Sequence, residues 1–333
     1  MTDPVGPLHP PATPPKGGLR VAHVSDLHIL HIDRFEPWRF VGKRITGGAN
    51  LLLKRKKAHS TEVVVQALEQ LQTLGVDQIV VTGDLSNLSL DSEFAAARQI
   101  IEAHGGGPER VSVIPGNHDR YTYGSALRRR FESCFSPFMA SDLPTDPDDP
   151  YPWVRLIDPG LAIVGICTSI PSPPLLAVGR VGSKQRDRLN ALLRRPELQG
   201  RFILAAMHHH LVPPRDHTPR GELMHGLIDA NDVMKDLLDN HTDLVIHGHN
   251  HQHGFTSHLR PDGGTMHICE AGSTSVSHHR DDHYGGKFNL YDLAPDPKGG
   301  KPTLARITTF LYRNPEAGFT PWKLHEPPFD GPR

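Results

Sequence analysis

Cysteine is scarce in this chain of 333 residues, which holds only Cys134, Cys167 and Cys269. The three lie far apart and none belongs to a C-x-x-C pair, so the sequence excludes a disulfide-stabilised scaffold and a cysteine-rich zinc site. So few thiols also indicate a protein of a reducing compartment.

Long apolar runs and an excess of charge are missing as well. The longest strongly apolar runs, at 161–167 and 202–207, have about a third of the length that a membrane-spanning helix needs. Lys and Arg together number 36 and Asp and Glu 37, so no basic field predicts nucleic acid as a partner. No secretory signal is recognisable, and we expect a cytoplasmic protein. Residues 1–18, with six prolines and three glycines, are expected to form a disordered leader.

Apolar periodicity in the first half of the chain alternates between strands and helices. It predicts buried strands at 19–24, 78–81 and 110–114, with helices at 61–74 and 93–104 between them. Such alternation is typical of right-handed crossovers that feed a largely parallel sheet.

The second half predicts more strands, and its last strands have no helices between them. Strands are expected at 153–157, 161–166, 202–207, 244–246, 254–259, 265–269 and 287–292, and helices at 183–194 and 230–239. We therefore expect an α/β fold, a four-layer α/β/β/α sandwich of two mixed sheets with helices outside. One domain should cover 19–312, and 313–333 should be a tail.

Histidine, in contrast, is abundant, with 23 residues, and ligand-type side chains follow successive predicted strands. Because the carboxyl ends of parallel strands meet in one crevice, we expect the active site there. The side chains are Asp26, His28, Asp84, Asn117, His118, Asp119, His208, His209, His210, His247, His249 and His251.

The donor types of this set limit the metals it can hold. The set contains no thiolate, and mixed imidazole and carboxylate donors suit Mn, Fe, Zn, Co or Ni. Two aspartates, four histidines and one asparagine exceed the needs of one tetrahedral site. They match two divalent ions about 3.5–4 Å apart that share a bridging carboxylate.

Five short motifs occur in a fixed order between Asp26 and His251: D-x-H, G-D, G-N-H-D, a histidine after a strand, and G-H-x-H. In this order they resemble the calcineurin-like metallophosphoesterase superfamily, and within it the bacterial phosphodiesterase-like branch. The resemblance covers about residues 19–293. It implies hydrolysis of phosphoric esters at a binuclear metal centre, with Mn, Fe or Zn as the expected ions.

The resemblance also implies how the donors divide between two ions. One ion would be held by Asp26, His28, Asp84 and His251. The other would be held by Asp84, Asn117, His208 and His249, so that Asp84 bridges the two. A hydroxide on the metals would attack phosphorus in line.

By the same resemblance, His118 follows the ligand Asn117 and would act on the scissile phosphate. It would stabilise the transition state or protonate the leaving oxygen, and Asp119 would orient its ring.

One motif departs from the family pattern. The family usually shows His-His-Pro after the fifth strand, whereas here three histidines precede Leu211. We align His208 with the ligand position and keep His209 as the alternative ligand or as a residue that faces the substrate.

The segment 31–60 is longer than an ordinary connection, and its part at 34–57 carries eight basic residues among apolar ones. One interpretation is a solvated helical excursion with exposed lysines and arginines. The other is a cap over the metals, in which Lys43 and Arg44 contact the substrate and 34–57 touches an anionic membrane surface.

Three functions stay open at this point. The first is a phosphodiesterase that acts on a cyclic nucleotide or another small diester. The second is a pyrophosphohydrolase of a nucleotide-linked lipid at a membrane surface, similar to the UDP-diacylglucosamine hydrolases of the same superfamily. The third is a non-catalytic metal-binding scaffold, which the intact ligand set and His118 disfavour. A protein phosphatase is disfavoured because no arginine follows Gly83-Asp84, and a DNA nuclease because the charge is balanced.

Overall fold

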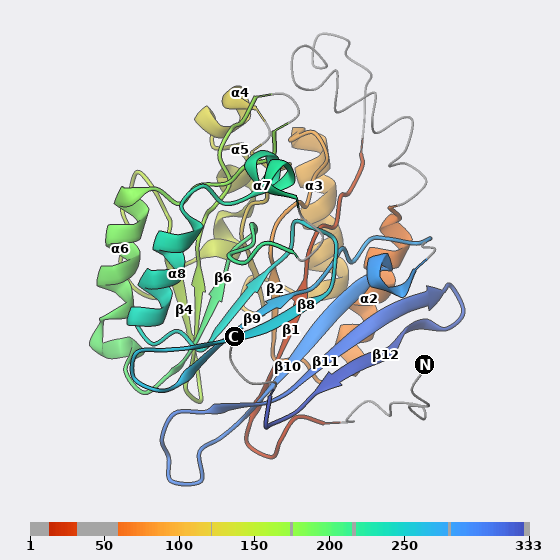
Figure 1. The fold of residues 1–333 in the computed structure, drawn as a ribbon. Helices are drawn as coiled ribbons and strands as arrows, with labels where there is room; N and C mark the ends of the chain where they lie inside the picture. The colour runs from red at the N-terminus through yellow and green to blue at the C-terminus, as the bar shows by residue number, and fades with distance from the viewer. Residues whose placement is uncertain are drawn as a thin grey trace.

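The computed structural model describes residues 13–31, 59–120, 122–173, 176–214, 218–278 and 281–329. Within them, two six-stranded sheets enclose one apolar core and carry helices on their outer sides (Figure 1). The predicted fold class, an α/β sandwich of two mixed sheets with flanking helices, is confirmed.

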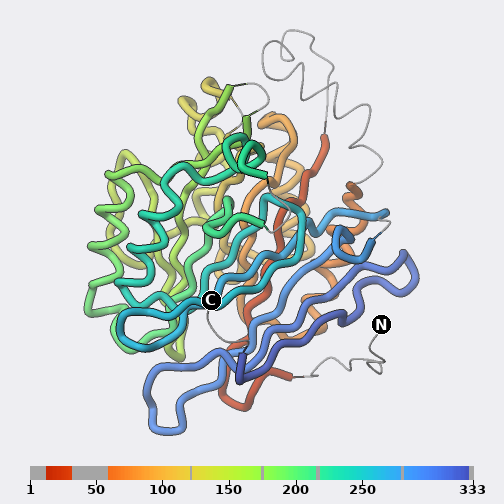
Figure 2. The backbone as a smooth tube through the Cα atoms, viewed as in Figure 1, coloured from red at the N-terminus to blue at the C-terminus, as the bar shows by residue number. Residues whose placement is uncertain are grey.

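The first sheet combines the two ends of the domain and has the order β12-β11-β10-β1-β2-β3. Its strands are β1 (Leu19–Val24), β2 (Gln78–Val81), β3 (Val111–Val113), β10 (Lys287–Ala294), β11 (Thr303–Asn314) and β12 (Gly318–His325). The first three are parallel, and β10, β11 and β12 extend the sheet in antiparallel pairs. Figure 2 shows β1, in red, beside the blue C-terminal strands.

The second sheet has the order β4-β5-β6-β7-β9-β8. Its strands are β4 (Trp153–Ile157), β5 (Leu161–Gly165), β6 (Phe202–Ala206), β7 (Leu244–His247), β8 (Gly254–Leu259) and β9 (Thr265–Glu270). The central strands β5, β6, β7 and β9 run parallel, and the edge strands β4 and β8 are antiparallel to their neighbours.

Helices connect most of the parallel strands. The α-helices are α2 (Thr61–Thr73), α3 (Asp91–Ile100), α4 (Tyr123–Leu127), α5 (Arg130–Phe135), α6 (Ser183–Leu193), α7 (Pro219–His225) and α8 (Ala230–Asp239). A π-helical turn, Ile101–Gly105, continues α3, and 3-10 turns occur at Ser136–Met139, Pro196–Leu198 and Asp282–Tyr284.

Strand β5 shows how the sequence builds the layers. Successive side chains of a strand point to opposite faces. Leu161 and Ile163 accordingly join the core between the sheets, whereas Ala162 and Val164 join a second core. That second core packs beneath α6 and α8 on the outer face (Figure 1). Because both faces are covered, an apolar run without alternation is what this strand requires.

Helix α2 follows the predicted pattern, because Val64, Ala67, Leu68 and Leu71 form its buried face. Helix α3 begins two residues before its predicted start at Glu93. The Glu93 carboxylate accepts the backbone N–H of Leu88 and of Leu90, which satisfies donors at the start of the helix.

The predicted C-terminal tail, 313–333, is wrong for residues 318–325, which form β12 at the edge of the first sheet. Only Phe319 of this strand is buried, so its sequence lacks the alternation of a half-buried strand. Pro321 lies beside a register shift against β11, and proline is tolerated only at such edge or irregular positions.

Several predictions fall outside the described residues. They are most of the leader at 1–18, the part 32–58 of the basic segment, and Lys43 and Arg44 within it. Substrate contact by these two residues and membrane contact by 34–57 stay predictions. Among the helices that are described, none is long and apolar enough to cross a membrane.

A buried ion pair joins β1 to β10. Arg20 is fully buried, and its Nε and Nη2 donate to the two oxygens of Asp292 at 2.6 and 3.1 Å. Arg306 donates to the same carboxylate at 2.6 Å, and Arg20 Nη1 donates to the Leu74 carbonyl. Asp292 therefore holds the cross-strand contact of the first and last parts of the sheet.

We expect Asp292→Ala to lower the free energy of unfolding by about 3–5 kcal/mol, because the Arg20 guanidinium is left buried without its counter-charge. Urea unfolding followed by circular dichroism measures the change. Asp239→Ala is the matched control, since Asp239 pairs with Lys235 on the exposed surface of α8, and it should change the value by less than about 1 kcal/mol. Equal small losses in both variants would contradict the role given to Asp292.

Candidate metal centre

The strand ends of both sheets bring the predicted donors to one edge of the sandwich. Asp26 follows β1, Asp84 follows β2 and Asn117 follows β3 in the first sheet. His208 follows β6 and His249 follows β7 in the second sheet. Each sheet thus supplies part of one site, as the order of the motifs predicts.

The turns that carry these donors have an unusual backbone. A positive φ is uncommon for residues other than glycine and is unfavourable unless the surroundings hold it. In the described part of the chain eight non-glycine residues have a positive φ, and five of them are predicted metal ligands. These five are Asp26, His28, Asp84, His249 and His251.

Hydrogen bonds between the turns hold this conformation. The backbone N–H of Asp26 donates to Gly83 and that of His28 donates to Asp84, at 3.0 and 2.9 Å. The backbone N–H of His249 donates to Asp26 Oδ2 at 3.1 Å, which connects the second sheet to the first.

The first predicted ion site is compact. His251 Nε2 lies 3.2 Å from Asp26 Oδ1 and 3.2 Å from His28 Nε2. Asp26 Oδ1 is buried and accepts no hydrogen bond from any described residue. One ligand atom each of Asp26, His28 and Asp84 lies within 4.8 Å of the others. An orphaned carboxylate oxygen among imidazole nitrogens fits a divalent cation.

The second predicted ion site is centred on Asn117. Its Oδ1 lies 3.0 Å from His208 Nε2 and 2.9 Å from His249 Nδ1. Asp84 Oδ1 lies 3.5 Å from the same nitrogen of His208. The oxygen and nitrogen donors that the resemblance assigns to one ion are therefore adjacent.

Asp84 lies between the two sites. Its Oδ2 is 3.9 Å from His28 Nε2, whereas its Oδ1 faces His208 and accepts the backbone N–H of His118 at 2.7 Å. A Cβ at Gly116 would lie 2.1 Å from Asp84 Oδ1, so glycine is required there. Burial disfavours the charged form of Asp84, but His208 and then His118 outweigh it and hold the pKa of the carboxyl below its usual range.

Hydrogen bonds to backbone carbonyls orient the imidazole rings of His208 and His249. His208 Nδ1 donates to the Thr82 carbonyl at 2.7 Å, and His249 Nε2 donates to the His225 carbonyl at 2.9 Å. In each ring the other nitrogen faces Asn117, and once deprotonated it can bind a metal, the arrangement expected of metal-binding histidines. Burial lowers the pKa of His249 well below its ordinary value, which favours the neutral, metal-binding form.

His209 is placed differently from His208. Its Nδ1 lies 2.8 Å from Thr168 Oγ1, and its Nε2 lies 3.1 Å from the Ala177 carbonyl. The side chain is fully buried. The geometry therefore supports His208 as the ligand, and His209 packs behind it.

His118 reaches the centre from the turn after β3. Its Nδ1 donates to the Asn87 carbonyl at 2.7 Å, and its ring centroid lies 5.2 Å from that of His28. Asp119 was expected to orient this ring, and that expectation is wrong. The Asp119 carboxylate instead accepts backbone N–H groups of Leu85, Ser86 and Gly116 and so holds the two turns together. Burial, and then the charge of Asp84, raise the pKa of Asp119 to about 7.

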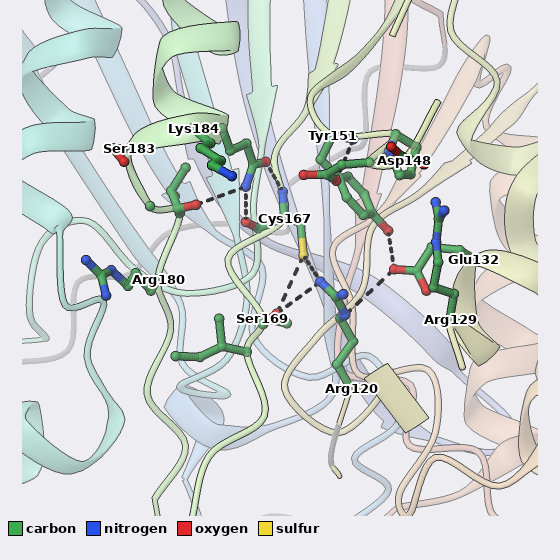
Figure 3. A pocket seen from close by; sticks show the side chains of 16 residues that line it. Arg120, Arg129, Glu132, Asp148, Tyr151, Cys167, Ser169, Arg180, Ser183 and Lys184 are labelled. Carbon is green, nitrogen blue, oxygen red and sulfur yellow. Dashed lines mark hydrogen bonds and ion pairs between the residues drawn. The ribbon is translucent and has the colours of Figure 1, made fainter. Parts of the chain in front are cut away.

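Arg120, the next residue, turns away from the ligands. Its Nη1 lies 3.1 Å from Cys167 Sγ and 3.3 Å from the Ser169 carbonyl, and its Nε lies 3.7 Å from Glu132 (Figure 3). It lines a pocket of about 570 Å³ that also includes Lys184. No sequence motif marks this pocket, because its residues come from helices and loops that are far apart in the chain.

His59 is a residue that the sequence analysis missed. One ring nitrogen each of His28, His59 and His251 lies within 4.8 Å of the others. His59 lies just before helix α2, and none of the predicted strands ends beside it, so neither the strand-end pattern nor any motif marks it.

Comparison with known proteins agrees with the site. Residues 19–253, more than half of the chain, match the family model described as calcineurin-like phosphoesterase. The chain belongs to this family. The calcineurin-like phosphoesterases depend on a binuclear metal centre. No curated protein matches it in sequence.

One of the solved structures that resemble this chain supports the same fold. A purple acid phosphatase from yellow lupin seeds has a TM-score of 0.53 at 14% identity, over 92% of this chain and 53% of that one. This calcineurin-like chain therefore spans about half the length of the lupin enzyme. PhoD gives a TM-score of 0.48 at 11% identity, with coverages of 95% and 73%. The phosphopantetheinyl hydrolase PptH of Mycobacterium tuberculosis gives 0.47 at 13%, with coverages of 85% and 98%.

The two neighbouring histidines allow a matched test. We expect His208→Ala to lose one of two bound Mn²⁺ ions per chain, because it removes a donor beside Asp84 and Asn117. His209→Ala should keep both ions, because its ring nitrogens contact Thr168 and Ala177. Metal content per folded chain, measured by plasma mass spectrometry after gel filtration, distinguishes the two variants. Loss of an ion from His209→Ala alone would reverse the assignment.

Proposed function

We propose that this calcineurin-like phosphoesterase hydrolyses phosphodiesters with two divalent transition-metal ions, Mn, Fe or Zn, as cofactors. The observation that carries the proposal is the Asp84 carboxylate, whose oxygens face His28 on one side and His208 on the other. When bound, the two ions would polarise the phosphoryl group and lower the pKa of a water molecule.

His118 is the residue that we assign to proton transfer. A carbonyl oxygen can only accept a hydrogen bond, so the bond to Asn87 places a proton on Nδ1 of His118. In the cationic ring Nε2 also carries a proton, and it is the nitrogen from which that proton passes to the leaving oxygen, which returns the ring to its neutral form. Asn87 acts as a positioning residue, because its carbonyl fixes the tautomer and the direction of the ring.

The charge of the substrate favours a phosphodiester over a phosphomonoester at this site. A phosphomonoester dianion carries more charge than a diester, and arginine is well suited to bind it in a two-pronged contact. The arginine next to the G-N-H-D motif, Arg120, instead contacts Cys167, Ser169 and Glu132.

Removal of the proton donor tests this role. We expect His118→Ala to lower kcat for bis(p-nitrophenyl) phosphate by about 10²–10⁴-fold, the usual contribution of general acid–base catalysis. Its content of two Mn²⁺ ions should not change, since His118 is not in either predicted ligand set. His104→Ala is the control, because this histidine lies in the π-helical turn after α3 and pairs with Glu69 of α2, and it contacts none of the predicted ligands. A wild-type kcat in the His118→Ala variant would contradict the assignment of His118 as the proton donor.

Substrate preference tests the reaction class. With Mn²⁺ bound, we expect kcat/KM for bis(p-nitrophenyl) phosphate to exceed that for p-nitrophenyl phosphate by about tenfold or more, a difference of about 1.4 kcal/mol in activation free energy. Release of p-nitrophenol measures both reactions on one enzyme batch. A preference for the monoester would show that the diesterase proposal is wrong, but it would not contradict the proposed metal centre.

A further inference from the structure

His59 lies at the first predicted ion site, although it belongs to none of the family motifs. Its ring centroid is 4.7 Å from that of His28 and 5.6 Å from that of His251. One nitrogen of each ring lies within 4.8 Å of the others, and His28 also belongs to the group that it forms with Asp26 and Asp84. The three imidazoles come from segments that are far apart in the sequence.

The backbone around His59 is held against the core. His59 forms an isolated antiparallel bridge with Val276, and the N–H of Ser60 donates to the Ser275 carbonyl at 2.8 Å. Helix α2 begins immediately afterwards, at Thr61. The position of His59 is therefore fixed by the same 273–276 segment that supports the turn after β1.

A chain of hydrogen bonds fixes the tautomer of the ring. Ser275 Oγ donates its single hydrogen to the carbonyl of Asp26 at 2.8 Å. With its hydrogen on that carbonyl, Ser275 Oγ accepts a hydrogen bond from Nδ1–H of His59 across a contact of 2.7 Å. This leaves the lone pair on Nε2. A hydroxyl or carbonyl that holds one ring nitrogen so that the other can bind a metal is the usual support of a histidine ligand.

We propose that His59 is an additional ligand of the ion held by Asp26, His28, Asp84 and His251, and that Ser275 positions it. The inference rests on the proposed binuclear centre but not on the nature of the substrate.

An additional histidine changes the number of protein donors at this ion site and therefore the ions that it suits. Together with the four donors of the motifs it gives five protein donors, more than a tetrahedral ion accepts. Three imidazoles and two carboxylates suit an ion that takes five or six ligands, such as Fe or Mn, better than a four-coordinate Zn²⁺. The two ions of the centre would then differ in protein ligands, because the described residues show no further histidine grouped in this way at the site around Asn117.

Metal binding in the absence of substrate tests the proposal. Apoprotein would be titrated with Co²⁺ against a chelating indicator, and the visible absorption spectrum recorded at each step. Wild type should bind two ions. His59→Ala should bind one of them at least about 10–100-fold more weakly, a loss typical of a perturbed ligand shell, and leave the affinity for the other unchanged. The Co²⁺ absorption of that ion should also intensify, because the coordination number falls.

Two further variants separate ligation from packing. Ser275→Ala keeps the ring but removes its support, so we expect a smaller loss of affinity at the same ion. His278→Ala removes an exposed histidine of the same segment and should bind both ions like wild type. Thermal unfolding of each apoprotein shows whether a variant has lost its fold, and His59→Gln replaces His59→Ala if it has.

The outcomes distinguish this inference from the proposed diesterase activity. Wild-type affinities and an unchanged Co²⁺ spectrum in a folded His59 variant would overturn the inference, even if the enzyme cleaves diesters. Selective loss of one ion would support it, even if bis(p-nitrophenyl) phosphate is not hydrolysed.

Discussion

The contact between Asp84 and His208 joins the two sheets at the position where the chemistry is proposed. Asp26, Asp84 and Asp119 are all buried at this edge, and buried carboxylates need compensating charge or hydrogen bonds. Backbone N–H groups serve Asp119, whereas Asp84 and Asp26 face imidazoles that come largely from the second sheet. Burial alone would lower the pKa of His208, but Asp84 and then Asp26 raise it to about 9. The same contacts therefore pack the two sheets against each other and create the affinity for cations.

The backbone of the turns that carry the donors is the second constraint, because several of these residues have a positive φ. A regular turn would direct the side chains after β1, β2 and β7 away from a shared centre. The positive φ of residues such as Asp26 and His249 is unfavourable locally, but it lets adjacent turns exchange backbone hydrogen bonds. Evenly packed strands beneath the turns hold them in place, which is consistent with strain that is concentrated at a functional site.

Much of this could be predicted from the sequence, because strand periodicity and strand-end donors depend on local patterns. The four-layer fold and the convergence of Asp84 and His208 follow from that logic. Strand β12 could not be predicted, since an edge strand with one buried side chain has almost no alternation. The role of Asp119 and the position of His59 depend on hydrogen bonds to residues about 33 and 216 positions away, which no local pattern records.

The sheet order has a consequence for how the chain folds during its synthesis. Strand β1 pairs with β2 on one side and with β10 on the other, and Arg20 meets Asp292 across a separation of 272 residues. Until the ribosome has released β10, one edge of β1 is unprotected and a buried arginine lacks its partner. The native first sheet is thus completed only after nearly the whole chain has emerged. Long-range closure of this kind makes folding slow.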